Sequence, residues 1–284
     1  MAMTVTPLTP DFCARITGIN ITLPLNDAEF AGFRAAFDRW SVLILPGQPL
    51  DDASQIAFSE NFGPLEPTRP VNPAAGTPFA RQSNLDIKTG AVIPADDRRM
   101  AYQKANMLWH SDSTFKAVPS LCSVLSARQV PAVGGATKFA STRAAYAELD
   151  EAVRLRLDTA VVEHDFSYSR GLAGFEFTAD ETAQFPPVRH RLVRVNANNG
   201  RKSVLIGAHA KSIVGWKAEE SRAMLDDLLV RAARHSYSHD WRQGDVVIWD
   251  NQAAVHRATP YDSVRHRRLM QRTTISSRNE AYAQ

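Results

Sequence analysis

The sequence predicts a mainly β protein with flanking helices, built on a double-stranded β-helix (jelly-roll) core. Short runs of β-branched and aromatic residues recur along the chain, and only a few segments carry the three- and four-residue apolar spacing of amphipathic helices. Many short strands with few helices favour two packed sheets over a doubly wound sheet. β folds often reach this size as one unit, so we expect a single domain over residues 1–284.

Three segments predict the flanking helices. The first begins at Asn26 or Asp27, either of which can cap a helix, and ends near Trp40 with aromatic side chains along one face. A second helix, capped by Ser141, is expected to run through Leu149 and Leu155. The third covers 217–233, with its inward side chains at Met224, Leu225, Leu228 and Leu229.

Short β-type runs lie between these helices, at 121–125, 190–195 and 203–206. Further on, 246–249 and 253–256 predict two short strands around a turn at Asp250 and Asn251. The segment of about 67–104 differs, since it is rich in Pro, Ala, Asn and Asp and shows little periodicity. Long loops in compact domains are usually functional or disordered, so this segment is either an active-site lid or a flexible loop.

Composition excludes several classes of function. The hydrophobic content of 44% and charged content of 22% are those of an ordinary globular protein. A net charge of +3 with no recognised motif argues against nucleic-acid binding, and no apolar run approaches membrane-spanning length. Cys13 and Cys122 suggest neither a disulfide framework nor a zinc site, and the first residues do not resemble a signal peptide. We therefore expect a cytoplasmic protein with no membrane partner.

Residues 110–112 read His-Ser-Asp, and His256 follows a Trp-Asp-Asn segment far downstream. In an extended strand His110 and Asp112 would point the same way, about 6–7 Å apart along the backbone. His256 from another strand would complete two imidazoles and one carboxylate. That set leaves one face of a metal open and is typical of non-haem Fe(II) oxygenases. A His-x-Asp pair alone, however, is more often structural than metal-binding.

Segments around this motif are similar to one family: 41–48, 55–58, 62–65, 106–115, 134–139 and 268–274. Together they resemble the Fe(II)- and 2-oxoglutarate-dependent dioxygenases that include taurine dioxygenase and 2,4-dichlorophenoxyacetate dioxygenase, over nearly the whole chain. Residues 108–113, 143–146 and 206–210 are most similar to the phenoxyacetate-degrading branch. The resemblance implies that His110, Asp112 and His256 hold Fe(II), with 2-oxoglutarate as co-substrate and O2 as oxidant.

The resemblance also implies how the co-substrate is held. Thr137 and Arg268 would bind the distal carboxylate of 2-oxoglutarate, for which a guanidinium is better suited than an ammonium. Arg267 stays an alternative, because the gap from the last metal ligand to Arg268 is one residue longer than is usual in the family. Arg272, four residues on, would reach toward 2-oxoglutarate or the anionic group of the substrate. Asn106 either lines the pocket near the co-substrate or is a strand-edge amide.

The activity that the resemblance implies is hydroxylation of a small anionic organic substrate, most closely an aryloxyalkanoate such as 2,4-dichlorophenoxyacetate. Cleavage of the ether would give a phenol and glyoxylate, with succinate and CO2 from 2-oxoglutarate. The alternatives are an alkylsulfonate dioxygenase of the taurine type and, more distantly, a non-catalytic metal- or ligand-binding jelly roll. The family also implies a homo-oligomer.

The other histidines are assigned no metal. His209 contacts substrate or is satisfied by a neighbour, and His235 and His239 are expected to form a surface pair on a strand. His164, His190 and His266 stand alone in the sequence and are given no role.

Overall fold

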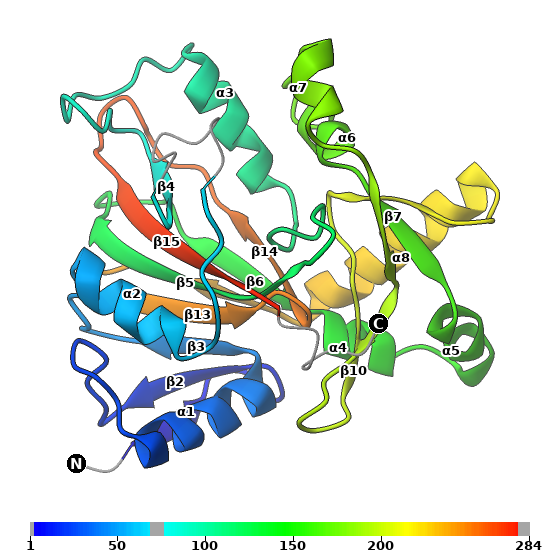
Figure 1. Ribbon diagram of the computed structural model, residues 1–284, viewed down its shortest axis with the longest axis horizontal. Helices are drawn as coiled ribbons and strands as arrows, with labels where there is room; N and C mark the ends of the chain where they lie inside the picture. The colour runs from blue at the N-terminus through cyan, green and yellow to red at the C-terminus, as the bar shows by residue number, and fades with distance from the viewer. Residues whose placement is uncertain (1–2, 69–76, 278–284) are drawn as a thin grey trace.

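The centre of the fold is a seven-stranded sheet, seen in a computed structural model that describes residues 3–68 and 77–277 (Figure 1). Its strand order is β1-β2-β3-β13-β5-β15-β4, and only β2 and β3 run parallel to each other. The strands are β1 (Thr4–Pro7), β2 (Cys13–Thr17), β3 (Val42–Leu45), β4 (Phe79–Ser83), β5 (Ser120–Gln129), β13 (Val246–Asp250) and β15 (Leu269–Ser276). Two of the predicted runs, 121–125 and 246–249, lie in the middle of this sheet.

A smaller sheet faces it, in the order β12-β6-β14, made by β12 (Ser236–His239), β6 (Thr137–Ser141) and β14 (Ala254–Ala258). Buried side chains of both sheets meet between them. Phe139 of β6 packs against Trp249 of β13, with ring centroids 5.5 Å apart, and Val247 and Ala254 complete the contact. Two facing sheets of this kind confirm the predicted jelly-roll core.

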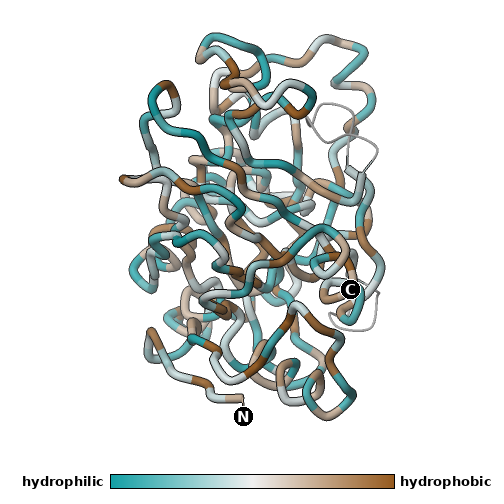
Figure 2. Tube along the Cα trace, turned by 90° about the vertical axis from the view of Figure 1, so that its left-hand side faces the viewer, coloured by the Kyte–Doolittle hydropathy of each residue, from teal (hydrophilic) through white to brown (hydrophobic). Residues whose placement is uncertain are grey.

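Two helices cover the outer face of the large sheet, α1 (Asp27–Trp40) and α2 (Asp52–Glu60) (Figure 1). Asn26 caps α1 reciprocally with Glu29, and Phe33 and Phe37 are fully buried against the sheet, as the apolar stripe predicts. Figure 2 shows hydrophilic residues in many of the outer loops and hydrophobic stretches crossing the interior.

Three helices, α4 (Thr142–Ala147), α5 (Glu151–Asp158) and α8 (Ala218–Arg234), pack beyond the smaller sheet with two further small sheets. The apolar face of α8 is confirmed, since Leu225 and Leu228 are buried in this layer. The prediction of a single helix that begins at Ser141 and runs through Leu155 is wrong, because two helices, α4 and α5, are formed. The chain breaks after α4 because Asp150 accepts a hydrogen bond from the Val153 amide and starts α5, which leaves Leu155 67% exposed. The strands of these sheets are β7 (Val161–His164), β8 (Val188–Arg191), β9 (Val193–Val195), β10 (Lys202–Val204) and β11 (Ala210–Ile213).

The segment expected as a long loop contains regular structure. Strand β4 pairs with β15 at the edge of the large sheet, and α3 (Arg98–Lys104) leads into a 3-10 turn, η1 (Ala105–Met107). Residues 69–76 lie outside the described part of the chain. Two short helices, α6 (Phe166–Gly171) and α7 (Ala179–Ala183), stand next to α3 in Figure 1.

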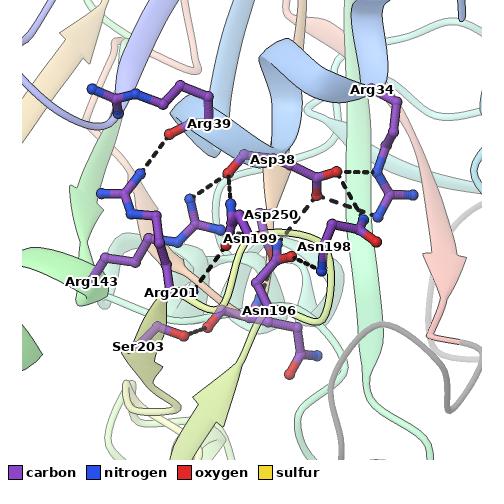
Figure 3. Close-up of polar contacts among 11 residues, drawn as sticks. Arg34, Asp38, Arg39, Arg143, Asn196, Asn198, Asn199, Arg201, Ser203 and Asp250 are labelled. Atoms are coloured by element: carbon purple, nitrogen blue, oxygen red, sulfur yellow. Dashed lines mark hydrogen bonds and ion pairs between the residues drawn. The ribbon is translucent and has the colours of Figure 1, made fainter. Parts of the chain in front are cut away.

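A polar network ties the end of α1 to the turn between β9 and β10 (Figure 3). The Asp38 carboxylate accepts hydrogen bonds from Asn196 and Asn198, and its backbone carbonyl accepts one from Arg143. Arg143 also forms a buried ion pair with Asp250 at the end of β13, 3.3 Å apart. The network therefore reaches from a surface helix to the turn that precedes β14.

Candidate active site

The predicted metal ligands meet where β14 passes residue 110. The amide of each histidine donates to the carbonyl of the other, with His110 N to His256 O at 3.0 Å and His256 N to His110 O at 2.8 Å. The extended strand expected over 110–112 is not formed. The chain turns after His110, and Ser113 adopts a φ of 56°. Gly207 lies against this bridge with a φ of 116°, where a Cβ would stand 2.9 Å from the His110 Cα, so only glycine fits.

The three side chains nevertheless point to one place. Donor atoms of His110, Asp112 and His256 lie within 4.8 Å of one another, and all three residues are buried. His110 Nε2 is 3.9 Å from Asp112 Oδ1, and His256 Nε2 is 3.7 Å from Asp112 Oδ2. Each histidine has a nitrogen free for a metal. His110 Nδ1 binds the Leu108 carbonyl at 2.8 Å, which leaves Nε2, and both nitrogens of His256 are buried without a hydrogen-bond partner in the described chain.

The electrostatics of the three groups suit a metal cation. Burial lowers the pKa of His110 and holds that of His256 well below its usual value, so both imidazoles are neutral. Burial alone would raise the pKa of Asp112, but the adjacent Arg272 guanidinium holds it below its usual value. Neutral imidazoles and an ionised carboxylate are the forms that bind metal. The donor set therefore fits a divalent ion such as Fe(II).

Asp112 is held by buried partners from two neighbouring strands. Ser123 Oγ on β5 donates to Asp112 Oδ2 at 2.7 Å. Asn251, directly after β13, accepts from the Asp112 amide at 3.0 Å and donates to Ser123 Oγ at 2.9 Å. Trp249 Nε1 donates to the same Asn251 oxygen. Such outer contacts fix the orientation of a metal ligand.

The residues predicted to hold the distal carboxylate of 2-oxoglutarate are also buried. Thr137 lies on β6, and its hydroxyl accepts a hydrogen bond from Trp241 Nε1 at 2.9 Å. Arg268 lies just before β15, its Nε has no partner in the described chain, and burial lowers its pKa to about 10. Arg267 is exposed and donates to the Gly90 carbonyl. Of the two arginines, Arg268 is thus the one that faces inward.

Two cavities share a wall at Gln82, Gln103 and Asn106. The first is lined by the metal-side residues, including Asp112 and Arg272, and the second by Arg268 with apolar neighbours. Asn106 belongs to η1, so it is not a strand-edge amide.

Arg272 lies on β15 and forms an ion pair with Asp112, so it reaches the metal-side cavity as its position four residues after Arg268 predicts.

The other histidines do not join the metal-binding group. His209 is buried in the first cavity, where its ring centroid is 4.8 Å from that of Phe115. His235 binds Glu148, and His239 binds Asp245. The strand predicted for this pair is confirmed as β12, but the expected surface position is wrong for His239, which is buried.

Sequence reasoning missed several residues of this site. Ser123 sits in an ordinary strand pattern, and Asn251 was noted only as part of a turn; neither has a motif that marks it. Arg170, Phe166 and Tyr102 also line the first cavity, and they come from short elements whose sequences show no periodicity.

Comparison with known proteins decides the family. Residues 4–274 match the family described as "Taurine catabolism dioxygenase TauD, TfdA family". The chain belongs to this family. It is 37% identical to an alpha-ketoglutarate-dependent 2,4-dichlorophenoxyacetate dioxygenase of Burkholderia sp. (strain RASC), over 95% of this chain and 94% of that protein. It is 38% identical to an (S)-phenoxypropionate/alpha-ketoglutarate-dioxygenase of Delftia acidovorans, over 91% of this chain and 90% of that protein.

A solved structure of AAD-2 in complex with Mn(II) and N-oxalylglycine superposes with a TM-score of 0.91, at 36% identity and with all of both chains covered. This TauD/TfdA family member is therefore an Fe(II)- and 2-oxoglutarate-dependent dioxygenase that uses O2. Among the described residues, no helix combines the length and the apolar character needed to cross a bilayer.

Proposed function

We propose that this dioxygenase acts on aryloxyalkanoates such as 2,4-dichlorophenoxyacetate. Hydroxylation of the carbon beside the ether oxygen gives a hemiacetal, which breaks down to a phenol and a 2-oxo acid, glyoxylate in the case of an aryloxyacetate. One O2 supplies one oxygen atom to the substrate and one to succinate, and 2-oxoglutarate loses CO2. The observation that carries the proposal is the identity of 36–38% with dioxygenases named for 2,4-dichlorophenoxyacetate or (S)-phenoxypropionate, over 90% or more of each chain.

The first cavity supports this substrate class. It combines a cation, Arg272, with three aromatic side chains, Tyr102, Phe115 and Phe166, next to the metal-binding group. An anionic head and a flat ring are complementary to these two kinds of wall.

We assign the metal to His110, Asp112 and His256, and the distal carboxylate of 2-oxoglutarate to Thr137 and Arg268. When bound, Fe(II) supplies the activation of O2, coupled to the oxidative decarboxylation of 2-oxoglutarate. The protein's own contribution is positional. Neutral imidazoles and the held carboxylate leave one side of the metal site open, the inward guanidinium anchors the co-substrate, and buried walls exclude water.

Product assays test the function. The protein, loaded with Fe(II), is given 2-oxoglutarate, O2 and either 2,4-dichlorophenoxyacetate or taurine, and phenol, sulfite and succinate are measured. We expect phenol and succinate in equal amounts with the first compound. Sulfite from taurine without phenol from the aryloxyacetate would instead identify an alkylsulfonate dioxygenase. Succinate formed at the same slow rate with and without either compound would reject both substrate classes.

We further propose that the chain is a single domain, and that the described residues of its 67–104 segment, 67–68 and 77–104, cover the active site. Gln82, Tyr102 and Gln103 of that segment line the first cavity, which supports this role. We also propose that the protein is a homo-oligomer and that it is cytoplasmic. Cys13 and Cys122 are both buried free thiols, which is compatible with a reducing compartment. Light scattering after gel filtration measures the oligomeric state.

A further inference from the structure

Arg170, on the short helix α6, is an unusual arginine because it is buried with only 7% of its surface exposed. Its guanidinium lies over two aromatic rings, 4.3 Å from the centroid of Tyr102 and 4.8 Å from that of Phe166. Cation–π contacts of this kind stabilise the charged group and limit its motion. The planar head is therefore held in one orientation.

Arg170 has no acidic ion-pair partner in the described part of the chain, and Asp112 acts on it only from a distance. Nη1 donates to the Tyr102 carbonyl at 3.0 Å, whereas the buried Nε has no hydrogen-bond partner. Two other arginines near the core do have acidic partners, since Arg143 pairs with Asp250 and Arg272 with Asp112. No carboxylate among residues 3–68 and 77–277 forms an ion pair with Arg170. A buried charge normally requires a partner, so an anion from outside the chain would complete this site.

The position of Arg170 indicates which anion. It lines the first cavity together with His110, Asp112 and Arg272, and it is not among the residues that line the second cavity, where Arg268 lies. Burial lowers the pKa of Arg170 and the nearby positive charge of Arg272 lowers it further, while Tyr102 and the Asp112 carboxylate raise it. Two guanidinium groups that repel each other across the cavity are stabilised by an anion bound there.

We propose that Arg170 binds the anionic group of the organic substrate and selects carboxylates over uncharged analogues. This assignment rests on the proposed function, because it takes an aryloxyalkanoate as the ligand. Arg272 lies in the same cavity but forms an ion pair with Asp112, so Arg170 adds a second cation that has no acidic ion-pair partner in the described chain. The guanidinium edge can hold a carboxylate through two parallel hydrogen bonds, which an ammonium cannot match.

The test is an equilibrium binding measurement without turnover. The wild-type protein and the Arg170→Gln and Arg170→Lys variants are loaded with Fe(II) and 2-oxoglutarate under anaerobic conditions. Phenoxyacetate and its uncharged analogue phenoxyacetamide are then titrated by calorimetry. Arg156→Gln is the matched control, because Arg156 also lies 4.3 Å from an aromatic centroid, that of Trp216, but is exposed and paired with Glu220.

We expect Arg170→Gln to weaken phenoxyacetate binding roughly ten- to a hundredfold, the range for a lost hydrogen bond to a charged group. Binding of phenoxyacetamide and of 2-oxoglutarate should stay within about twofold, and Arg170→Lys should be intermediate. Equal loss for the acid and the amide, or a loss confined to 2-oxoglutarate, would overturn the assignment. If Arg170→Gln does not fold, Arg170→Lys decides, and wild-type affinity in that variant rejects the two-bond contact. No binding of phenoxyacetate to the wild type would reject the proposed substrate class instead.

Discussion

Ser123 Oγ donates a 2.7 Å hydrogen bond to Asp112 Oδ2, and both residues are buried. The bond joins a strand in the middle of the large sheet to a turn that carries a metal ligand. Asn251, directly after β13, accepts a hydrogen bond from the Asp112 amide and donates one to Ser123 Oγ. The sheet interior, rather than the turn itself, therefore fixes the direction of the carboxylate.

Replacing Ser123 with alanine should weaken Fe(II) binding by roughly tenfold, because partners of metal ligands typically contribute ten- to a hundredfold to affinity. The measurement is an anaerobic Fe(II) titration. Ser126→Ala is the control, since Ser126 is buried on the same strand but donates to Gln55. Equal iron affinity in both variants would show that the Ser123 contact only stabilises the fold.

Replacing Asp112 with alanine should abolish turnover, because the metal site loses its only carboxylate. The fold should stay intact, because the backbone bridge between His110 and His256 remains. Iron content and thermal unfolding are measured together. His110→Ala should behave in the same way. Iron-dependent activity near the wild-type level in either variant would refute the assignment of the metal ligands.

Arg268→Ala should raise the KM for 2-oxoglutarate by roughly ten- to a hundredfold, since it removes a charged hydrogen-bond donor from a buried site. Arg267→Ala should leave that KM unchanged, because the Arg267 side chain is exposed and contacts the Gly90 carbonyl. The reverse pattern in steady-state kinetics would exchange the two roles.

Acidification should destabilise the metal-free protein through His164, which is fully buried and has no hydrogen-bond partner in the described chain. Burial holds its pKa well below the unfolded value of about 6.5, so the unfolded state binds a proton that the native state does not. Stability is therefore full above that pH and falls below it, by up to about 1.4 kcal/mol per pH unit for this group.

Urea unfolding between pH 5 and 8 measures this effect, with His164→Phe as the comparison. Below pH 6.5 we expect the unfolding free energy of the variant to change less steeply with pH than that of the wild type, by the slope that corresponds to uptake of about one proton on unfolding. Identical slopes for the two proteins would show that His164 becomes protonated in the native state.

The elements that could be predicted from the sequence are those with a local pattern, such as a helix cap, an apolar stripe or a turn, that matches the face they bury. Helix α1 has both a cap and an apolar stripe, and β13 and β14 are separated by a clear turn. The break between α4 and α5 was missed because Asp150 competes as a cap inside a helical pattern. Strand β4 could not be predicted because it lies at the edge of the sheet, and its extended conformation depends on backbone pairing with β15 rather than on a local pattern.

In the site, the convergence of His110, Asp112 and His256 could be predicted because the segments around them resemble one family, whereas the His-x-Asp spacing alone was not decisive. Ser123 and Arg170 could not, since nothing local distinguishes a buried serine that binds a carboxylate, or an arginine that lacks one, from their common counterparts. Their roles depend on which distant segments the fold brings next to them.

The backbone pairing of His110 with His256 also sets the time at which the protein can acquire iron. During synthesis the N-terminal part of a chain emerges first, at about 5–20 residues per second. A nascent chain that has just released β5 and β6 carries only His110 and Asp112, because His256 on β14 has not yet been translated. Iron loading is thus a late event that follows translation of β14, and a chain terminated before that strand has no complete centre to fill.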